Sequence, residues 1–172
     1  MVEQQLDLVQ AIRPGNIIPD FRLQSTHGPW LSRDDFFDRR LILIFTGWNN
    51  CQKTRSFLRE IRGIFPRIAF EETVPLLIAP EEADTGRLAV PPVTVPFPVL
   101  RDVNANVHRT FGAVNWGGQP ALSLFITNRH RQVIYRALSG LHERLPSGGE
   151  IVTFLDFDAL ACSDCGQPSR LG

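Results

Sequence analysis

Apolar and polar positions follow two different periods along the chain, which separates predicted strands from predicted helices. Leu41–Phe45 is continuously apolar, as in a strand buried on both faces of a sheet. After Cys51 the apolar positions fall at helical spacing with Arg and Glu between them, and Gly63 and Pro66 predict the end of this helix. Val74–Ala79 predicts a second buried strand.

The second half of the chain predicts two helices and a pair of strands. Either Asp102 or Asn104 is suited to cap a short helix that ends at Phe111. Residues 122–127 and 132–137 are two apolar segments about five residues apart, and this spacing predicts an antiparallel hairpin. A last helix is predicted over residues 148–161.

This order of elements predicts an α/β fold. A right-handed βαβ unit followed by a ββα unit gives a central mixed sheet of four to five strands, flanked by helices on both faces. We expect one domain over residues 1–161, with an N-terminal extension at 1–12 and a C-terminal tail at 162–172.

Composition fits a packed domain and excludes two classes of partner. The chain has 172 residues, 43% of them apolar, and 18 acidic residues balance 18 basic ones. With no net charge, we expect binding neither to nucleic acid nor to an anionic membrane. No segment approaches the length of a membrane span, and the first ten residues lack the apolar region of a secretory signal. We therefore expect a cytoplasmic protein whose three cysteines are free or redox-active thiols.

Four segments in order resemble the redoxin family, the AhpC/TSA (alkyl hydroperoxide reductase and thiol-specific antioxidant, peroxiredoxin-like) group of thioredoxin-like proteins. They are PGNIIPDFRL, LILIFTGWNNCQKTRSFLREI, VPFPVLRDVNANVHRTFGAV and LFITNRHRQVIYR. The likeness extends over roughly residues 13–160. It implies a thioredoxin-like fold and an oxidoreductase or antioxidant activity that depends on a thiol.

Cys51 is the candidate catalytic residue. It stands where the strand runs into the helix, and the unpaired N–H groups of a helix start favour the thiolate form. Lys53 and Arg55 act in the same direction. A thiolate of this kind attacks a peroxide or a disulfide. The alternative is that Cys51 is a small buried apolar residue.

The chain departs from the peroxiredoxin motif P-x-x-x-T-x-x-C that the resemblance brings with it. Counting back from Cys51, Trp48 takes the threonine position and Ile44 the proline position. Thr46 offers a hydroxyl two residues away. The arginine that the family places before its closing hairpin is also missing, since that neighbourhood reads Pro120-Ala-Leu-Ser.

The thioredoxin-type pattern W-C-x-x-C is incomplete as well. Thr54 stands where the second cysteine would follow, and its hydroxyl is able to hydrogen-bond a thiolate but not to form a disulfide. Pro120 precedes a strand, as does the cis-proline that faces the active site of thioredoxin-like proteins. We expect Pro120 there, either in the cis form or as an ordinary turn proline.

Cys162 and Cys165 form a C-x-x-C after the predicted last helix. Three interpretations remain open: a resolving pair for Cys51, half of a zinc site, or two coincident surface cysteines. Fourteen helical residues place the pair about 20 Å from the start of that helix. A disulfide with Cys51 would then need a partner subunit or an unravelled tail.

Two functional hypotheses follow. The first is a peroxiredoxin-like thiol peroxidase or thiol-disulfide oxidoreductase, with Cys51 as nucleophile, a thiol reductant such as a thioredoxin, and a possible homodimer. The second is a non-catalytic redoxin, a redox sensor or protein-binding module without the peroxidase groups. We expect no cofactor, and the four histidines share no spacing that would hold a metal.

Overall fold

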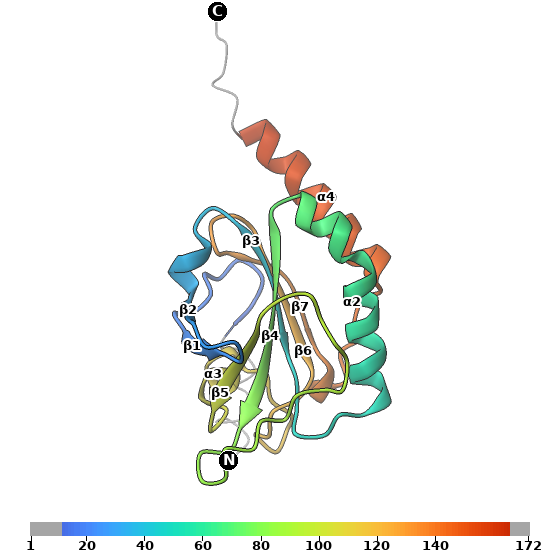
Figure 1. Ribbon diagram of the computed structural model, residues 1–172. Helices are drawn as coiled ribbons and strands as arrows, with labels where there is room; N and C mark the ends of the chain where they lie inside the picture. Colours follow the sequence, from blue (N-terminus) through green and yellow to red (C-terminus); the bar gives the residue numbers. More distant parts are fainter. Residues whose placement is uncertain (1–11, 166–172) are drawn as a thin grey trace, which may run out of the picture.

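The computed structural model describes residues 12–165, so most of the predicted extension at 1–12 and part of the predicted tail lie outside the described residues. One seven-stranded sheet forms the centre of the molecule (Figure 1). Its strands are β1 (Arg22–Ser25), β2 (Trp30–Ser32), β3 (Arg40–Phe45), β4 (Thr73–Glu81), β5 (Val99–Val103), β6 (Ser123–Thr127) and β7 (Val133–Leu138). The helices are α2 (Gln52–Phe70), α3 (Asn106–Phe111) and α4 (Gly148–Cys165), with short 3-10 turns η1 (Arg33–Phe36) and η2 (Ser139–Leu141).

The sheet is mixed, as predicted, but it has more strands than the expected four or five. Strands β3, β4 and β5 run parallel, while β6 and β7 form the antiparallel hairpin beside β3. The difference is the β1–β2 hairpin, which adds to the far edge of β5 through pairs such as Gln24 with Arg101. This hairpin covers backbone groups that would otherwise form an open edge.

Two apolar cores lie on the two faces of the sheet. Leu41, Leu43 and Phe45 of β3 contribute to the core that contains Phe111 of α3. Ile42 and Ile44 point to the opposite face, where α2 and α4 pack side by side (Figure 1). All five of these β3 side chains are at most 1% exposed. The structure thus confirms that the apolar run is a strand buried on both faces.

Helix α2 extends beyond the end that its sequence predicts. Pro66 lies inside the helix, which continues to Phe70. A proline removes one helical hydrogen bond and usually ends or kinks a helix. The following turn nevertheless places Ile68 in the core with no exposed surface, and this burial favours continuation of the helix past Pro66.

Helix α4 runs in the same direction as α2 and is longer than predicted. Gly148 lies beside Ile64 in the middle of α2, and Asp156 pairs with Arg67 near the end of α2 at 3.0 Å. The helix continues to Cys165 rather than ending at 161, so the Cys162–Cys165 segment forms its last turn. That turn lies at the end of the molecule opposite the start of α2 (Figure 1).

Candidate active site around Cys51

The turn between β3 and α2 presents Cys51 at the surface. Cys51 is the residue that precedes the first turn of α2, with extended backbone angles of φ −72° and ψ 166°. Its thiol is free and the residue is exposed. The sulfur lies 3.5 Å from Oγ1 of Thr54, which is itself 2% exposed. The i, i+3 spacing at the helix start therefore places a buried hydroxyl against an accessible thiol.

Hydrogen bonds lower the pKa of the Cys51 thiol. The largest cause is the Thr54 hydroxyl, followed by the Thr54 backbone N–H; partial burial opposes them, and the Lys53 backbone N–H adds to the lowering. Hydrogen bonds of this kind are made to the thiolate and so favour it. From the sequence we expected the charges of Lys53 and Arg55 to contribute to this lowering of the Cys51 pKa. Hydrogen bonds supply it instead, and the Arg55 guanidinium donates to the carbonyl oxygen of Asn50 at 3.3 Å.

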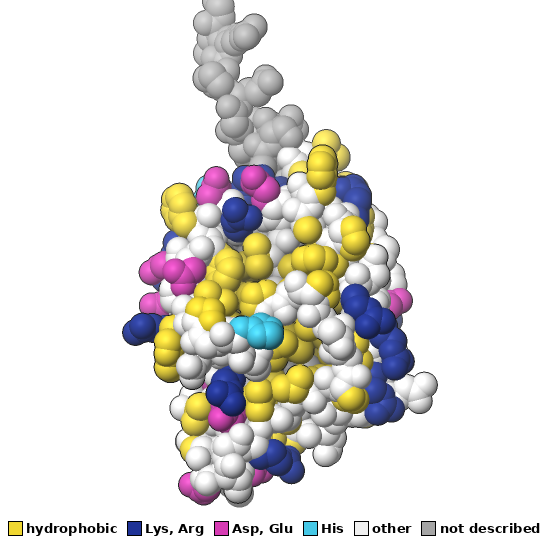
Figure 2. All heavy atoms as spheres, viewed as in Figure 1, with side chains coloured by type: hydrophobic (Ala, Val, Ile, Leu, Met, Phe, Trp, Pro, Cys, Tyr) yellow, Lys and Arg dark blue, Asp and Glu magenta, His cyan; other side chains and the backbone are white. Residues whose placement is uncertain are grey.

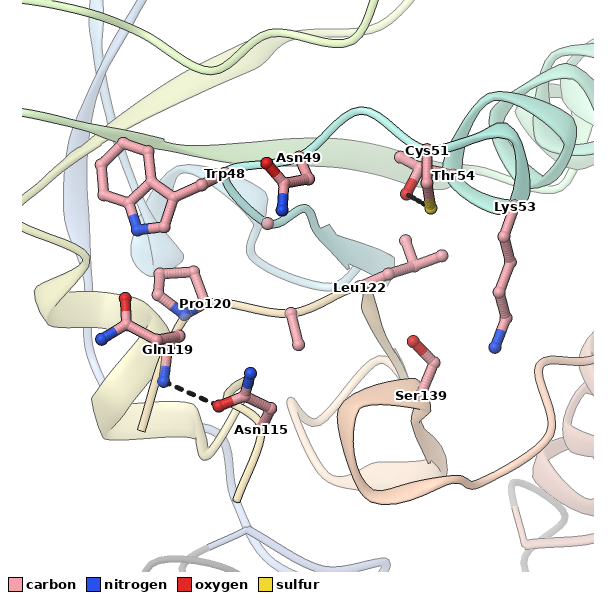
Figure 3. Close-up of a pocket in the computed structure, with 12 residues that line it drawn as sticks. Trp48, Asn49, Cys51, Lys53, Thr54, Asn115, Gln119, Pro120, Leu122 and Ser139 are labelled. Carbon is pink, nitrogen blue, oxygen red and sulfur yellow. Dashed lines mark hydrogen bonds between the residues drawn. The ribbon is translucent and has the colours of Figure 1, made fainter. Parts of the chain in front are cut away.

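A pocket of about 400 Å³ opens in front of the sulfur (Figure 3). Three segments that are distant in sequence meet there: the turn after β3, the loop before β6, and the turn after β7. The lining residues are Gly47, Trp48, Asn49, Cys51, Lys53, Thr54, Asn115, Gln119, Pro120, Ala121, Leu122 and Ser139.

The pocket brings together most of the residues that the sequence singled out. Trp48, Thr54 and Pro120 all line it with Cys51. The peptide bond before Pro120 is trans, since the described residues contain no cis peptide bond, so the cis alternative is wrong. Thr46 does not line the pocket. Its side chain is fully buried, and its hydroxyl oxygen has no hydrogen-bond partner within the described part of the chain.

The missing peroxidase groups are not replaced from elsewhere in the fold. None of the lining residues is an arginine, and Lys53 is the one cationic side chain among them. Among the side chains that the structure describes, residues 12–161, no group of three or more His, Cys, Asp or Glu would hold a metal ion. The described lining therefore supplies a thiol, one ammonium group, amides and hydroxyls.

A buried pair beneath the active-site turn was not foreseen. His108 and Asp102 are at most 1% exposed, and Nδ1 of the imidazole lies 2.6 Å from Oδ2 of the carboxylate. The other ring nitrogen, Nε2, donates to the carbonyl oxygen of Thr46 at 2.8 Å, because a carbonyl only accepts. Asp102 also accepts the backbone N–H groups of Val107 and His108 in the first turn of α3, although the residue at the cap position itself is Ala105, which makes no side-chain capping bond. The pair links α3 and β5 to the first residue of the turn.

Gly47 allows the active-site turn to approach Pro120 closely. A Cβ at Gly47 would lie 2.7 Å from the carbonyl oxygen of Pro120, shorter than real Cβ contacts allow. We therefore expect Gly47→Ala to lower the free energy of unfolding by about 1–3 kcal/mol, the usual cost of overpacking. Urea denaturation measures this difference.

Gly63→Ala is the matched control. Gly63 lies on the exposed side of α2, and a Cβ there would have nothing within 4 Å. In an exposed helix alanine is more favourable than glycine by about 0.8–1 kcal/mol, so this variant should be stabilised. A loss of stability at Gly63, or none at Gly47, would contradict the assignment of the two environments.

This arrangement defines a class of protein: a thioredoxin-like redoxin that presents one cysteine at a strand–helix junction. The chain belongs to the AhpC/TSA family, whose family model matches residues 14–136. No curated protein matches it. No helix among the described residues is both long and apolar enough to cross a membrane.

Solved structures share the fold at low sequence identity. AhpC of Enterococcus faecalis is 15% identical with a TM-score of 0.72, over 91% of this chain and 98% of that one. AhpC of Mycobacterium bovis is 13% identical with a TM-score of 0.65, over 84% and 96%. A Chlorobium tepidum structure provisionally named a thiol:disulfide interchange protein, DsbE, is 17% identical with a TM-score of 0.64, over 87% and 97%. The likeness is one of fold.

Proposed function

We propose that Cys51 is the nucleophile of a thiol-dependent oxidoreductase that reduces a peroxide or a disulfide. The observation that carries the proposal is an exposed thiol whose pKa is lowered by the buried Thr54 hydroxyl. With a peroxide, the thiolate attacks one oxygen, the O–O bond breaks, and the second oxygen leaves as water or an alcohol after protonation. The sulfur is oxidised to a sulfenate, which two external thiols return to the thiolate as they form a disulfide.

The proposal requires a reductant from outside the pocket. No second cysteine lines it, and the last turn of α4 lies at the other end of the molecule. A thiol reductant such as a thioredoxin, in the reducing cytoplasm, suits a single-cysteine enzyme.

Phe70, Phe157 and Leu160 are exposed apolar residues that support pairing of two copies, and light scattering would measure the resulting mass.

The rate of Cys51 alkylation as a function of pH tests the proposal. Because a lowered pKa gives thiolate at lower pH, we expect the iodoacetamide rate to rise with a midpoint below about 8.5, the value of a free thiol. Thr54→Val removes the hydroxyl while keeping the backbone N–H, so its curve should move to higher pH. Thr153→Val, a matched change on the exposed side of α4, should leave the curve in place.

The second candidate is a non-catalytic redoxin, a redox sensor or binding module. The absence of an arginine from the pocket lining, with Trp48 in the position of the family's threonine, favours this alternative. It predicts an alkylation midpoint at or above that of the free thiol and no effect of Thr54→Val. Such a result would reject the catalytic proposal.

A further inference from the structure

Apart from the Cys51 thiolate itself, the pocket around the sulfur carries positive charge only. Lys53 is the single other charged side chain among the described lining residues, and none of them is a carboxylate. Lys53 is also the only lysine among the chain's 18 basic residues. Lys and Arg side chains gather over α2 on the side of the molecule that Figure 2 displays, and Lys53 belongs to the first turn of that helix.

Three hydrogen-bond donors with no partner among the described residues line the pocket. Oδ1 of Asn115 accepts the backbone N–H groups of Gly117 at 2.9 Å and Gln119 at 3.0 Å, which fixes the amide so that its Nδ2 faces the pocket (Figure 3). The Lys53 ammonium and the Ser139 hydroxyl also point into this space. Within the described residues, neither side chain has a hydrogen bond or ion pair.

A group of acidic side chains lines a different, neighbouring pocket. Glu81, Glu82 and Asp84 line a second hollow, on the other side of Trp48 and Pro120, which contribute to both. The Arg87 guanidinium lies 5.6 Å from the centre of the Trp48 ring, and one of its nitrogens lies 3.8 Å from a carboxylate oxygen of Glu82. The second hollow therefore has a cationic side chain beside its acidic ones. The space in front of the sulfur is therefore cationic and rich in donors above an apolar base that includes Leu122.

We propose that this pocket selects a small substrate that carries a carboxylate beside the bond that Cys51 attacks. The inference rests on the proposed function of Cys51 and adds a substrate class to it. The Lys53 ammonium receives the carboxylate, Nδ2 of Asn115 is a further donor on the other side of the pocket, and the apolar base accommodates the carbon chain between the carboxylate and the reacting atom.

Matched small disulfides make the step measurable. The Cys51 thiolate attacks one sulfur of the disulfide, a new bond forms between Sγ and that sulfur, and the other half leaves as a thiolate. Cys51 is thereby oxidised to a mixed disulfide while the substrate is reduced to one thiol. Dithiodipropionate, bis(hydroxyethyl) disulfide and cystamine carry negative, neutral and positive ends of similar length.

Stopped-flow rates of mixed-disulfide formation with the three probes test the proposal on the full chain. A unit charge about 4 Å from the ammonium in water gives roughly a fivefold effect, so we expect the anionic probe to react about fivefold faster than the neutral one, and the cationic probe more slowly. Added salt should reduce the difference. Equal rates for the three probes would overturn the substrate class but not the nucleophile, whereas no reaction with any of them, together with no thiol-dependent consumption of hydrogen peroxide, would reject the proposed function itself.

Two variants locate the preference. Lys53→Gln should bring the ratio of anionic to neutral rates close to one while leaving the neutral rate within about twofold. Asn115→Asp keeps an oxygen for the two backbone N–H groups but turns the free donor into a carboxylate oxygen, so it should favour the cationic probe. Arg59→Gln removes an exposed charge from α2 outside the pocket and should leave the ratio unchanged. A ratio that falls equally in Arg59→Gln would assign the effect to the whole helix surface and overturn the proposal.

Discussion

Replacement of Cys51 by serine is expected to reduce thiol-dependent consumption of hydrogen peroxide to the uncatalysed rate. Hydrogen bonds from the Thr54 hydroxyl and N–H lower the pKa of the Cys51 thiol and favour its thiolate, whereas a serine hydroxyl without a neighbouring base remains protonated. No other cysteine lines the pocket to take its place. Peroxide loss followed in the presence of a thiol reductant gives the comparison, and equal rates for the two proteins would reject the role of Cys51.

The pair Cys162 and Cys165 supplies the control for this experiment. If Cys51 works alone, the double variant Cys162→Ser with Cys165→Ser keeps the wild-type rate. Mass spectrometry of the oxidised protein then shows a sulfenate on Cys51. A disulfide between Cys51 and either residue would instead identify a two-cysteine enzyme. Because the end of α4 lies at the far side of the molecule, such a bond would join two chains or require that end to unravel.

Local pattern was sufficient to predict the features that depend on neighbouring residues. The apolar run of β3, the helix start after Cys51 and the contact of Thr54 with the sulfur all follow from spacings of a few residues. The end of α2 was wrong because burial of Ile68 favours a turn that Pro66 disfavours locally. Strand count was wrong because nothing in the β1–β2 hairpin indicates which sheet edge it will cover.

The shape of the pocket depends on contacts that no local pattern contains. Its lining joins the turn after β3 with the loop before β6, and these meet only because β3 and β6 pair in the sheet. The buried pairing of His108 was not predicted from the sequence for the same reason. Its ring donates to Thr46, which is 62 positions away in the sequence, and an isolated histidine on a short helix carries no sign of that partner.

Removal of the Asp102 carboxylate is expected to cause the largest loss of stability. Asp102→Ala leaves Nδ1 of the buried His108 ring without its hydrogen-bond partner and frees two backbone N–H groups at the start of α3. Truncating one member of a buried polar pair costs about 3–5 kcal/mol, a large part of the 5–15 kcal/mol that typically holds a domain folded. Urea denaturation of the variant gives the free energy of unfolding.

A double variant distinguishes the cost of an unpaired His108 imidazole from the other causes of the stability loss in Asp102→Ala. His108 packs edge-on against Phe45, with ring centroids 5.0 Å apart, so an apolar side chain suits its site. Asp102→Ala combined with His108→Leu leaves no unpaired imidazole, and we expect it to be more stable than Asp102→Ala alone. Additive losses in the double variant would show that the two side chains act independently. If the pair also holds the active-site turn through Thr46, both variants should slow Cys51 alkylation under conditions where each remains folded.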